Sequence, residues 1–107
     1  MAEDNFPVYE LRLPSGKKVR FDAPVAQTLT FEGAIVVRLD SLLGQNVFGI
    51  SEDGDILWQA EATETHAGRT PYNEIWKQDN NAILANVDRY LVIVPQSGMV
   101  IRRYSEK

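Results

Sequence analysis

Apolar and polar residues alternate along most of the chain, and short clusters of turn-forming residues interrupt this alternation. Around Ser15-Gly16 the alternation runs through residues 7–22, which predicts a β-hairpin with strands at 8–13 and 17–22. Alternate side chains of a strand share one face of the sheet. Each strand of the hairpin therefore carries one apolar row, formed by Tyr9, Leu11 and Leu13 on the first strand and by Val19 and Phe21 on the second.

Two groups of four strands are predicted after this hairpin. Runs rich in β-branched and aromatic residues are separated by turn-forming residues, as at Glu32-Gly33 and Glu52-Asp53-Gly54. Asn80-Asn81 and Ser97-Gly98 suit the hairpin turns of the second group. The sequence thus predicts one all-β domain over residues 1–107, with about ten short antiparallel strands in repeated hairpins and meanders. The eight strands after the hairpin are placed at 28–31, 34–39, 46–51, 55–62, 72–77, 82–87, 90–94 and 99–104.

Three segments between the strands are predicted to be irregular. Residues 23–27 form a short connection after the hairpin. Residues 40–45 form a loop with one helical turn, which Asp40 would cap and Gly44 would end. Residues 63–71 contain almost no apolar side chain, and we expect them to form the longest loop of the chain.

The segment after that loop has two interpretations. Thr70-Pro71 is a favourable N-cap and first-position pair for a short helix that would run through Trp76. Asp79-Asn80-Asn81 would stop such a helix within a few residues. We favour a strand at 72–77 and keep a short helix over 70–78 as the alternative.

The chain contains three similar hairpins, in which a strand reaches a glycine turn and a second strand follows. Tyr9 to Gly16, Val47 to Gly54 and Leu91 to Gly98 each span seven positions, and the glycines lie 38 and 44 positions apart. Such spacing is typical of solenoid or propeller repeats. The segments "NVFGISEDGDILWQAE" and "RYLVIVPQSGMVIRRYSE" resemble the inner part of a β-propeller blade of the quinoprotein type.

This resemblance covers about two blades and a hairpin, and the chain departs from it at two positions. Pro95 stands where such repeats usually carry an acidic residue, and Arg102 takes the position that matches Trp58. We therefore carry over neither the cofactor nor the active site of that family, and we predict no cofactor.

A closed propeller typically needs four or more blades, so other surfaces must cover the predicted sheets. The runs 34–37 and 91–94 are apolar at every position, which indicates strands buried on both faces. We therefore expect self-association, either by stacking on a neighbouring chain or by assembly of several copies around an axis. A monomeric two-sheet sandwich or partly closed barrel is the alternative.

Composition and charge narrow the range of partners. The chain has 107 residues, of which 44% are hydrophobic and 24% charged, as in ordinary globular domains. Its net charge of −4 opposes the counterion release that drives nucleic-acid binding. No apolar run approaches the roughly 20 residues that cross a bilayer, and the acidic N-terminus differs from a secretory signal. The absence of cysteine fits a reducing compartment, and we expect a cytoplasmic protein. The charge and the short apolar runs lead us to expect no nucleic-acid and no membrane partner.

Residues that carry chemistry are sparse. The single histidine, His66, lies in the predicted 63–71 loop with Arg69. The acidic segment 51–55, SEDGD, lacks the ligand spacing of a calcium loop and is better explained as a hairpin turn. No common nucleotide, zinc-protease or esterase motif occurs either. We therefore assign no catalytic residue and no metal ligand.

Aromatic residues offer the best binding surfaces, because they concentrate interface energy. Trp58 alternates with Ile56 and is predicted to lie in the core, whereas Trp76 and Tyr104 are candidates for a surface. We predict a non-enzymatic binding or scaffold module that recognises a protein or small molecule. A small enzyme at a subunit interface, built from His66 and nearby carboxylates, is the alternative. The predicted binding residues are His66, Arg69, Tyr72 and Trp76.

Overall fold

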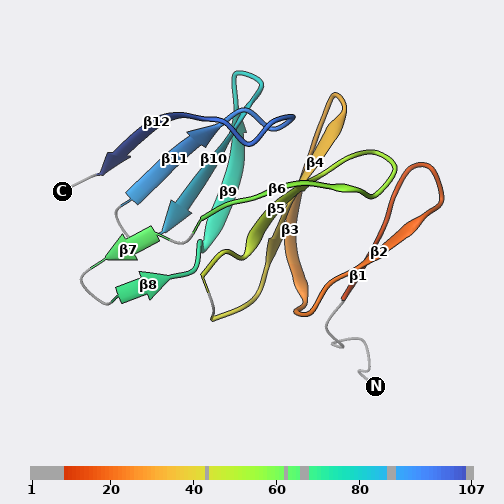
Figure 1. The fold of residues 1–107 in the computed structure, drawn as a ribbon, viewed down its shortest axis with the longest axis horizontal. Coiled ribbons are helices and arrows are strands. Elements are labelled where there is room, and N and C mark those ends of the chain that lie inside the picture. The colour runs from red at the N-terminus through yellow and green to blue at the C-terminus, as the bar shows by residue number, and fades with distance from the viewer. Residues whose placement is uncertain (1–8, 43, 62, 66–67, 87–88, 106–107) are drawn as a thin grey trace.

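The fold is built of antiparallel strands, and the part of the chain that the structure describes contains no helix (Figure 1). The computed structural model describes residues 9–42, 44–61, 63–65, 68–86 and 89–105, with only the backbone at 63–65 and 68–69. Ten of the strands in these residues coincide with predicted ones, so the predicted all-β fold of short antiparallel strands is confirmed. The strands are β1 (Glu10–Arg12), β2 (Lys18–Arg20), β3 (Val25–Phe31), β4 (Ala34–Leu39), β5 (Val47–Ile50), β6 (Ile56–Gln59), β7 (Thr63–Thr65), β8 (Gly68–Thr70), β9 (Glu74–Gln78), β10 (Asn81–Asn86), β11 (Arg89–Ile93) and β12 (Val100–Ser105).

Most strands pair with their neighbours in the sequence, which produces two four-stranded meanders. The strands β3 to β6 form one sheet, here called the central sheet, and β9 to β12 form the C-terminal sheet. β1 pairs with β2 in the N-terminal hairpin, and β7 pairs with β8 in a second hairpin. In Figure 1 the central sheet lies between the N-terminal hairpin and the C-terminal sheet. The main body of the chain is therefore a stack of three β layers.

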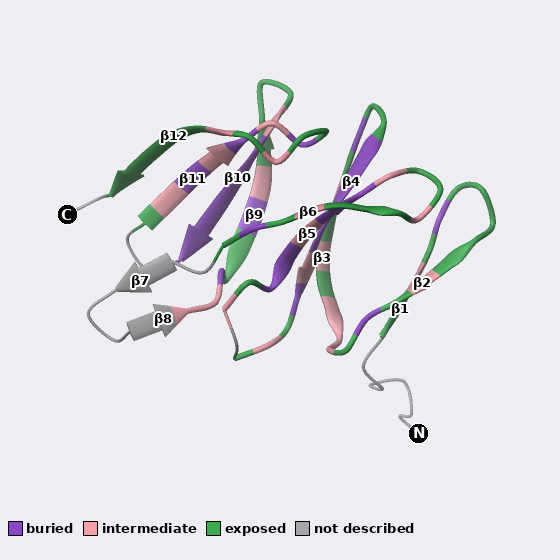
Figure 2. Cartoon of the chain, in the orientation of Figure 1, coloured by how far each residue is buried: buried purple, intermediate pink, exposed green. Residues whose placement is uncertain are grey.

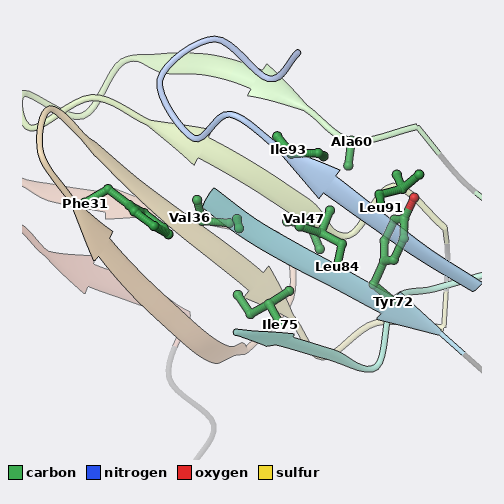
Figure 3. Packing of buried hydrophobic residues seen from close by; sticks show 10 residues of the cluster. Phe31, Val36, Val47, Ala60, Tyr72, Ile75, Leu84, Leu91 and Ile93 are labelled. Carbon is green, nitrogen blue, oxygen red and sulfur yellow. The ribbon is translucent and has the colours of Figure 1, made fainter. Parts of the chain in front are cut away.

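The inner core fills the space between the central and C-terminal sheets (Figure 3). Val36 on β4 and Leu84 on β10 are completely enclosed there, and Figure 2 shows both strands as largely buried. Burying an aliphatic side chain of this size stabilises a fold by about 1.5–3 kcal/mol. The buried members of the inner core are Phe31, Val36, Val47, Ala60, Tyr72, Ile75, Ala82, Leu84, Leu91 and Ile93.

The outer core lies between the central sheet and the N-terminal hairpin. β4 contributes to both cores, because Val36 faces the inner core while Ile35 and Val37 face the outer one. This confirms the burial on both faces that the apolar run 34–37 predicts. The run 91–94 is less enclosed, since Val92 is only half-buried. The buried members of the outer core are Leu13, Phe21, Ile35, Val37, Leu39 and Ile50.

Two side-chain amides fasten the central sheet to the segment that begins the C-terminal sheet. Gln27 Nε2 donates to the Ile75 carbonyl over 3.2 Å, and the Ile75 N–H donates to Gln27 Oε1 over 3.0 Å. Asn46 makes the same pair of bonds with the backbone of Tyr72, each 2.9 Å long. Each amide thus pairs with one backbone residue as a neighbouring strand would. The bonds satisfy polar groups that lie between the sheets.

Arg38 on β4 places a charge next to this junction. Its Nε donates to Gln27 Oε1 over 2.7 Å. Desolvation by burial lowers the pKa of Arg38, and the negative charges of Asp40 and Glu74 oppose that effect by raising it. The guanidinium remains positively charged, because arginine titrates far above neutral pH.

The two longer segments predicted as loops differ from the structure in part. The prediction of an irregular loop at 63–71 is wrong, because β7 and β8 form a hairpin there. Asn86 Nδ2 holds the end of this hairpin by donating to Thr70 Oγ1 over 2.9 Å. The described residues of 40–45 form a loop as predicted, but they contain no helical turn: Leu42 and Gly44 are bends, and Gln45 has a positive φ of 63°.

The strand at β9 confirms the favoured interpretation of residues 72–77 over the short helix. Two boundaries nevertheless shift. The turn between β9 and β10 uses Asp79 and Asn80, with φ values of 54° and 69°, and lies one residue before the predicted pair. β3 begins at Val25, so it takes in part of the predicted connection 23–27, with an irregular register between Val25 and Gln27.

All three predicted glycine turns are present. Gly16, Gly54 and Gly98 have φ values of 96°, 96° and 78°, a conformation that glycine adopts without a steric penalty. The three turns end β1, β5 and β11 respectively, so the first hairpin stands alone where the other two are the last hairpins of four-stranded sheets. The repeat in the sequence therefore corresponds to a repeat of hairpins in the structure.

Trp58 on β6 joins the central sheet to the third glycine turn. It is half-buried and packs against the inner core, and its Nε1 donates to the Pro95 carbonyl over 2.7 Å. The expectation that Ile56 shares its face is wrong. The register of β5 and β6 shifts between Gly49 and Ile50, so Ile56 faces the other side of the sheet and is 60% exposed. A bulge of this kind reverses the alternation of side chains.

Candidate functional site

The four predicted binding residues lie in different environments. His66 is outside the described residues, and Arg69 is placed only by its backbone, which pairs with Glu64. Tyr72 is 1% exposed in the inner core, where its hydroxyl donates to the Glu61 carbonyl over 2.8 Å. It is therefore a packing residue that a partner at the surface does not reach. Trp76 is half-buried and, because its neighbour Ile75 points into the inner core, it lies on the opposite face of the C-terminal sheet.

Trp76 belongs to a row of rings on that outer face. The centroids of Trp76 and Tyr90 lie 6.2 Å apart in an edge-to-face arrangement at 70°. Tyr90 stacks on Tyr104 with centroids 4.9 Å apart and planes 14° apart. Arg102 places its guanidinium carbon 5.0 Å from the centroid of Tyr104. We call this surface, formed by Trp76, Tyr90 and Tyr104 with Arg102 and Glu74 at its edges, the aromatic face.

Strand register brings these residues together. One row of cross-strand neighbours on this face runs Glu74, Ala85, Tyr90 and Tyr104. The adjacent row runs Trp76, Ile83, Val92 and Arg102. Side chains in such positions are close enough to interact. Ile83 and Ala85 are only 2% and 8% exposed, so the larger side chains cover the middle of the sheet.

In its described residues, the aromatic face combines apolar surface with one acidic and one basic side chain at its edges. Glu74 on β9 and Arg102 on β12 are both exposed. Tyr104 is 38% exposed, and its contact with Arg102 leaves a cation above an aromatic ring at the sheet edge. Aromatic residues and arginine are enriched at protein–protein interfaces.

A groove of about 720 Å³ lies on the other side of the molecule, between the N-terminal hairpin and the central sheet. Phe21 and Phe48 line it with centroids 5.8 Å apart, and exposed Leu42 and Ile56 also border it. The amide of Asn46, which is polar and lines the same groove, is already bonded to backbone groups at both ends. The groove therefore offers mainly apolar contacts.

The described part of the chain contains neither a candidate metal site nor a candidate membrane-spanning helix. Within it, no three His, Cys, Asp or Glu residues come together as a group that could hold a metal ion. None of its elements is a helix of the length and apolarity that spans a membrane. A smaller, mainly polar hollow of about 460 Å³ lies near Phe31 and Lys77, so the aromatic face and the groove are the larger apolar features of the described surface.

Tyr90 was not identified as a binding residue from the sequence. It stands within an apolar run, and only the pairing of β11 with β12 shows that it lies opposite Tyr104. The signal was present in the last hairpin, because a turn at Ser97-Gly98 already fixes which residues of the two strands oppose one another to within one position.

Comparison with known proteins gives one match. Residues 6–103 match the model of a protein family described as a domain of unknown function, DUF7957. No curated protein and no solved structure matches the chain.

Proposed function

The chain belongs to the DUF7957 family of domains of unknown function, and we propose that it is a non-enzymatic interaction module that associates with itself through the aromatic face. The proposal takes up the self-association expected from the sequence. It moves the docking surface from the four predicted binding residues to the outer face of the C-terminal sheet, whose first strand carries Trp76. Of the four predicted binding residues, Trp76 contributes its side chain to this surface.

The observation that carries the proposal is a difference between the two large sheets. The central sheet packs against the inner core on one face and against the outer core on the other. In the described residues, the C-terminal sheet packs against the inner core on one face only. The other two layers, the central sheet and the N-terminal hairpin, lie on the side of that face (Figure 1). Its other face carries the row of rings formed by Trp76, Tyr90 and Tyr104. A second molecule would cover this sheet as the N-terminal hairpin covers the central one.

The chemistry of the face supports a protein partner. Tyrosine, tryptophan and arginine are the residues most enriched among interface positions with large binding energies. Aromatic rings also lose few rotatable bonds when they become fixed, so they bind at a low entropic cost. The two charged side chains that the structure describes on this face, Glu74 and Arg102, lie at opposite edges of the sheet, so they form no cluster of charges that would have to be desolvated together.

The repetition of four-stranded meanders along the chain also supports this proposal. The two four-stranded meanders follow one another in the chain, and their first strands β3 and β9 are in contact. Propeller-type blades have the same order, in which each sheet packs against the next. The described residues form two such sheets and two hairpins, fewer than the four or more blades of a closed propeller. Packing of a further sheet on the C-terminal one, supplied by a second copy, would continue the same order.

Light scattering coupled to size exclusion tests this function. The chain has a mass of 12.1 kDa, and we expect the measured mass to rise toward a multiple of it as the protein concentration increases. Tyr104→Ser should weaken association by about tenfold or more, as loss of an interface aromatic does. Tyr9→Ser is the matched control, because Tyr9 is 40% exposed against 38% for Tyr104 and lies at the other end of the stack. A mass fixed at 12.1 kDa up to the highest soluble concentration would contradict the proposal.

A further inference from the structure

The two ends of the layer stack are chemically different. At one end, the N-terminal hairpin turns Leu11 and Val19 toward the outer core. The residues that alternate with them face solvent and are all charged. They are Glu10, Arg12, Lys18 and Arg20. Within the part of the chain that the structure describes, Glu10 and Arg20 are the two that form an ion pair, with 3.0 Å between Oε2 and Nη1. The opposite end of the stack is the aromatic face.

This difference decides between two modes of self-association. In a head-to-tail array or ring, the aromatic face of one copy would cover the hairpin of the next and remove Arg12 and Lys18 from water. Among its described residues, the aromatic face has one carboxylate, Glu74, and already carries the cation Arg102. Such an interface would therefore hold more cations than anions, and desolvated charges without partners oppose binding. Two aromatic faces placed against each other contain equal numbers of the two charges.

The aromatic face is also complementary to itself. Its two rows run across the sheet from β9 to β12, as defined above. A twofold axis that lies in the interface, parallel to the strands and between β10 and β11, places β9 of one copy opposite β12 of the other. Trp76 then lies opposite Arg102 of the second copy, and Glu74 lies opposite Tyr104 of the second copy. Ile83 and Ala85, in the middle of the face, are only 2% and 8% exposed, so the rings and the edge side chains make the contact.

We propose that the partner of this domain is a second copy, bound face to face through the two aromatic faces in a twofold dimer in which each Trp76 receives Arg102 of the other copy. This inference rests on the proposed function and specifies its partner and geometry. Arg102 already lies over Tyr104, so its guanidinium is held at the edge of the face that the second Trp76 approaches. Aligned packing of two sheets in this way is common among β proteins.

The size of the face indicates how strongly it binds. Four strands spaced by about 4.8 Å and five residues of about 3.3 Å each give a face of roughly 20 by 17 Å. The area of such a face is below the roughly 800 Å² per partner that stable protein complexes typically bury. We therefore expect a reversible dimer, with dissociation that dilution reveals, and no larger assembly.

The contact between Trp76 of one copy and Arg102 of the other can be tested, because the two residues are too far apart to touch within one molecule. Trp76 and Arg102 are on the two edge strands of the same sheet, separated by three strand spacings or about 14 Å. Substitutions this far apart within one molecule usually have additive effects. Coupling between positions 76 and 102 in the dimerisation constant would therefore report a contact between copies.

The experiment measures the dimer dissociation constant by sedimentation equilibrium for Trp76→Arg, Arg102→Glu and the double variant. Trp76→Arg should weaken dimerisation by about tenfold or more, because it places two guanidinium groups against each other, and Arg102→Glu should also weaken it. The double variant should recover most of the loss, because Arg at 76 meets Glu at 102 of the second copy. Lys18→Glu is the control, since it changes the charge by the same amount as Arg102→Glu at the other end of the stack.

Each result has a distinct meaning. Loss in both single variants, recovery in the double variant and an unchanged control support the twofold dimer. A wild-type chain that associates, but in which the two losses simply add or Lys18→Glu weakens association as strongly, overturns the face-to-face geometry and leaves the proposed function standing. A wild-type chain that remains at 12.1 kDa overturns the proposed function as well. Thermal unfolding of each variant separates these outcomes from loss of the fold.

Discussion

Replacing Asn46 with alanine is expected to destabilise the domain by about 3–5 kcal/mol, a large part of the stability of a domain of this size. Asn46 is 3% exposed. Its Nδ2 donates to the carbonyls of Leu39 and Tyr72, and its Oδ1 accepts from the Tyr72 N–H, all over 2.9 Å. Alanine leaves three backbone groups of the buried residues Leu39 and Tyr72 without these partners, and the cost of their desolvation then appears.

Urea-induced unfolding monitored by circular dichroism measures this effect. Gln59→Ala is the matched control, because Gln59 also donates from a side-chain amide to a backbone carbonyl, that of Gln45 over 2.9 Å, but is exposed. Its cost should stay below about 1 kcal/mol. A loss for Asn46→Ala no larger than that of Gln59→Ala would show that the amide bridge does not hold the two sheets together.

The second large effect is expected at the third glycine turn, where Gly98→Ala should cost about 2–4 kcal/mol against about 1–2 kcal/mol for Gly33→Ala. The two glycines have nearly identical φ values of 78° and 79°, so alanine strains the backbone equally at both. They differ in their surroundings. A Cβ at Gly33 meets no atom within 4 Å, whereas one at Gly98 lies 2.7 Å from Trp58 Cβ and 3.0 Å from its Cδ1.

The difference between the two variants therefore isolates the contact with Trp58. This contact is close on both sides, because a Cβ at Gly49 would also overlap the Trp58 ring. Displacing the ring would in addition strain the bond from Trp58 Nε1 to the Pro95 carbonyl. Equal unfolding free energies for Gly98→Ala and Gly33→Ala would contradict the view that Trp58 is fixed between the two sheets by glycine.

Turn glycines and apolar runs in the sequence predicted much of the fold. Glycines at 16, 54 and 98 mark the three hairpin turns because these turns need a positive φ, which other residues rarely adopt. The run 34–37 predicted a strand buried on both faces because no polar side chain interrupts it, and β4 has the bounds that were expected. These features depend on neighbours in the sequence, so the sequence alone is sufficient to find them.

Features that depend on register were harder to predict. The irregular pairing between Gly49 and Ile50 places Ile56 and Trp58 on opposite faces, and nothing in a regular alternation indicates such a bulge. The burial of Tyr72 has the same origin. Its backbone is held by Asn46, 26 positions earlier in the chain, so a residue that belongs to the inner core was predicted to be a binding residue.

The β7–β8 hairpin shows a limit of hydrophobic patterning. Its residues are mostly polar, so the alternation that identified the other strands is absent. The aromatic face illustrates the same point for function. Trp76 was a candidate from the sequence, but its association with Tyr90 and Tyr104 requires the register of three strands. A surface assembled across a sheet becomes visible only when its strands are paired.

Stability and binding should be separable in this domain. The aromatic rings lie on the face of the C-terminal sheet that is directed away from both cores. Asn46 and Gly98, by contrast, act at contacts between the layers. Substitutions at the aromatic face should therefore change association with small effects on unfolding, while those at the layer contacts should do the reverse.

The most direct test of the aromatic face as the association surface is fluorine NMR of the protein labelled with 5-fluorotryptophan. The chain has two tryptophans, and they serve as probe and control: Trp76 lies on the aromatic face, whereas Trp58 is packed between the two sheets. We predict that the Trp76 signal shifts or broadens as the protein is concentrated while the Trp58 signal stays in place. A Trp76 signal that does not change over a range in which the mass increases would contradict the account.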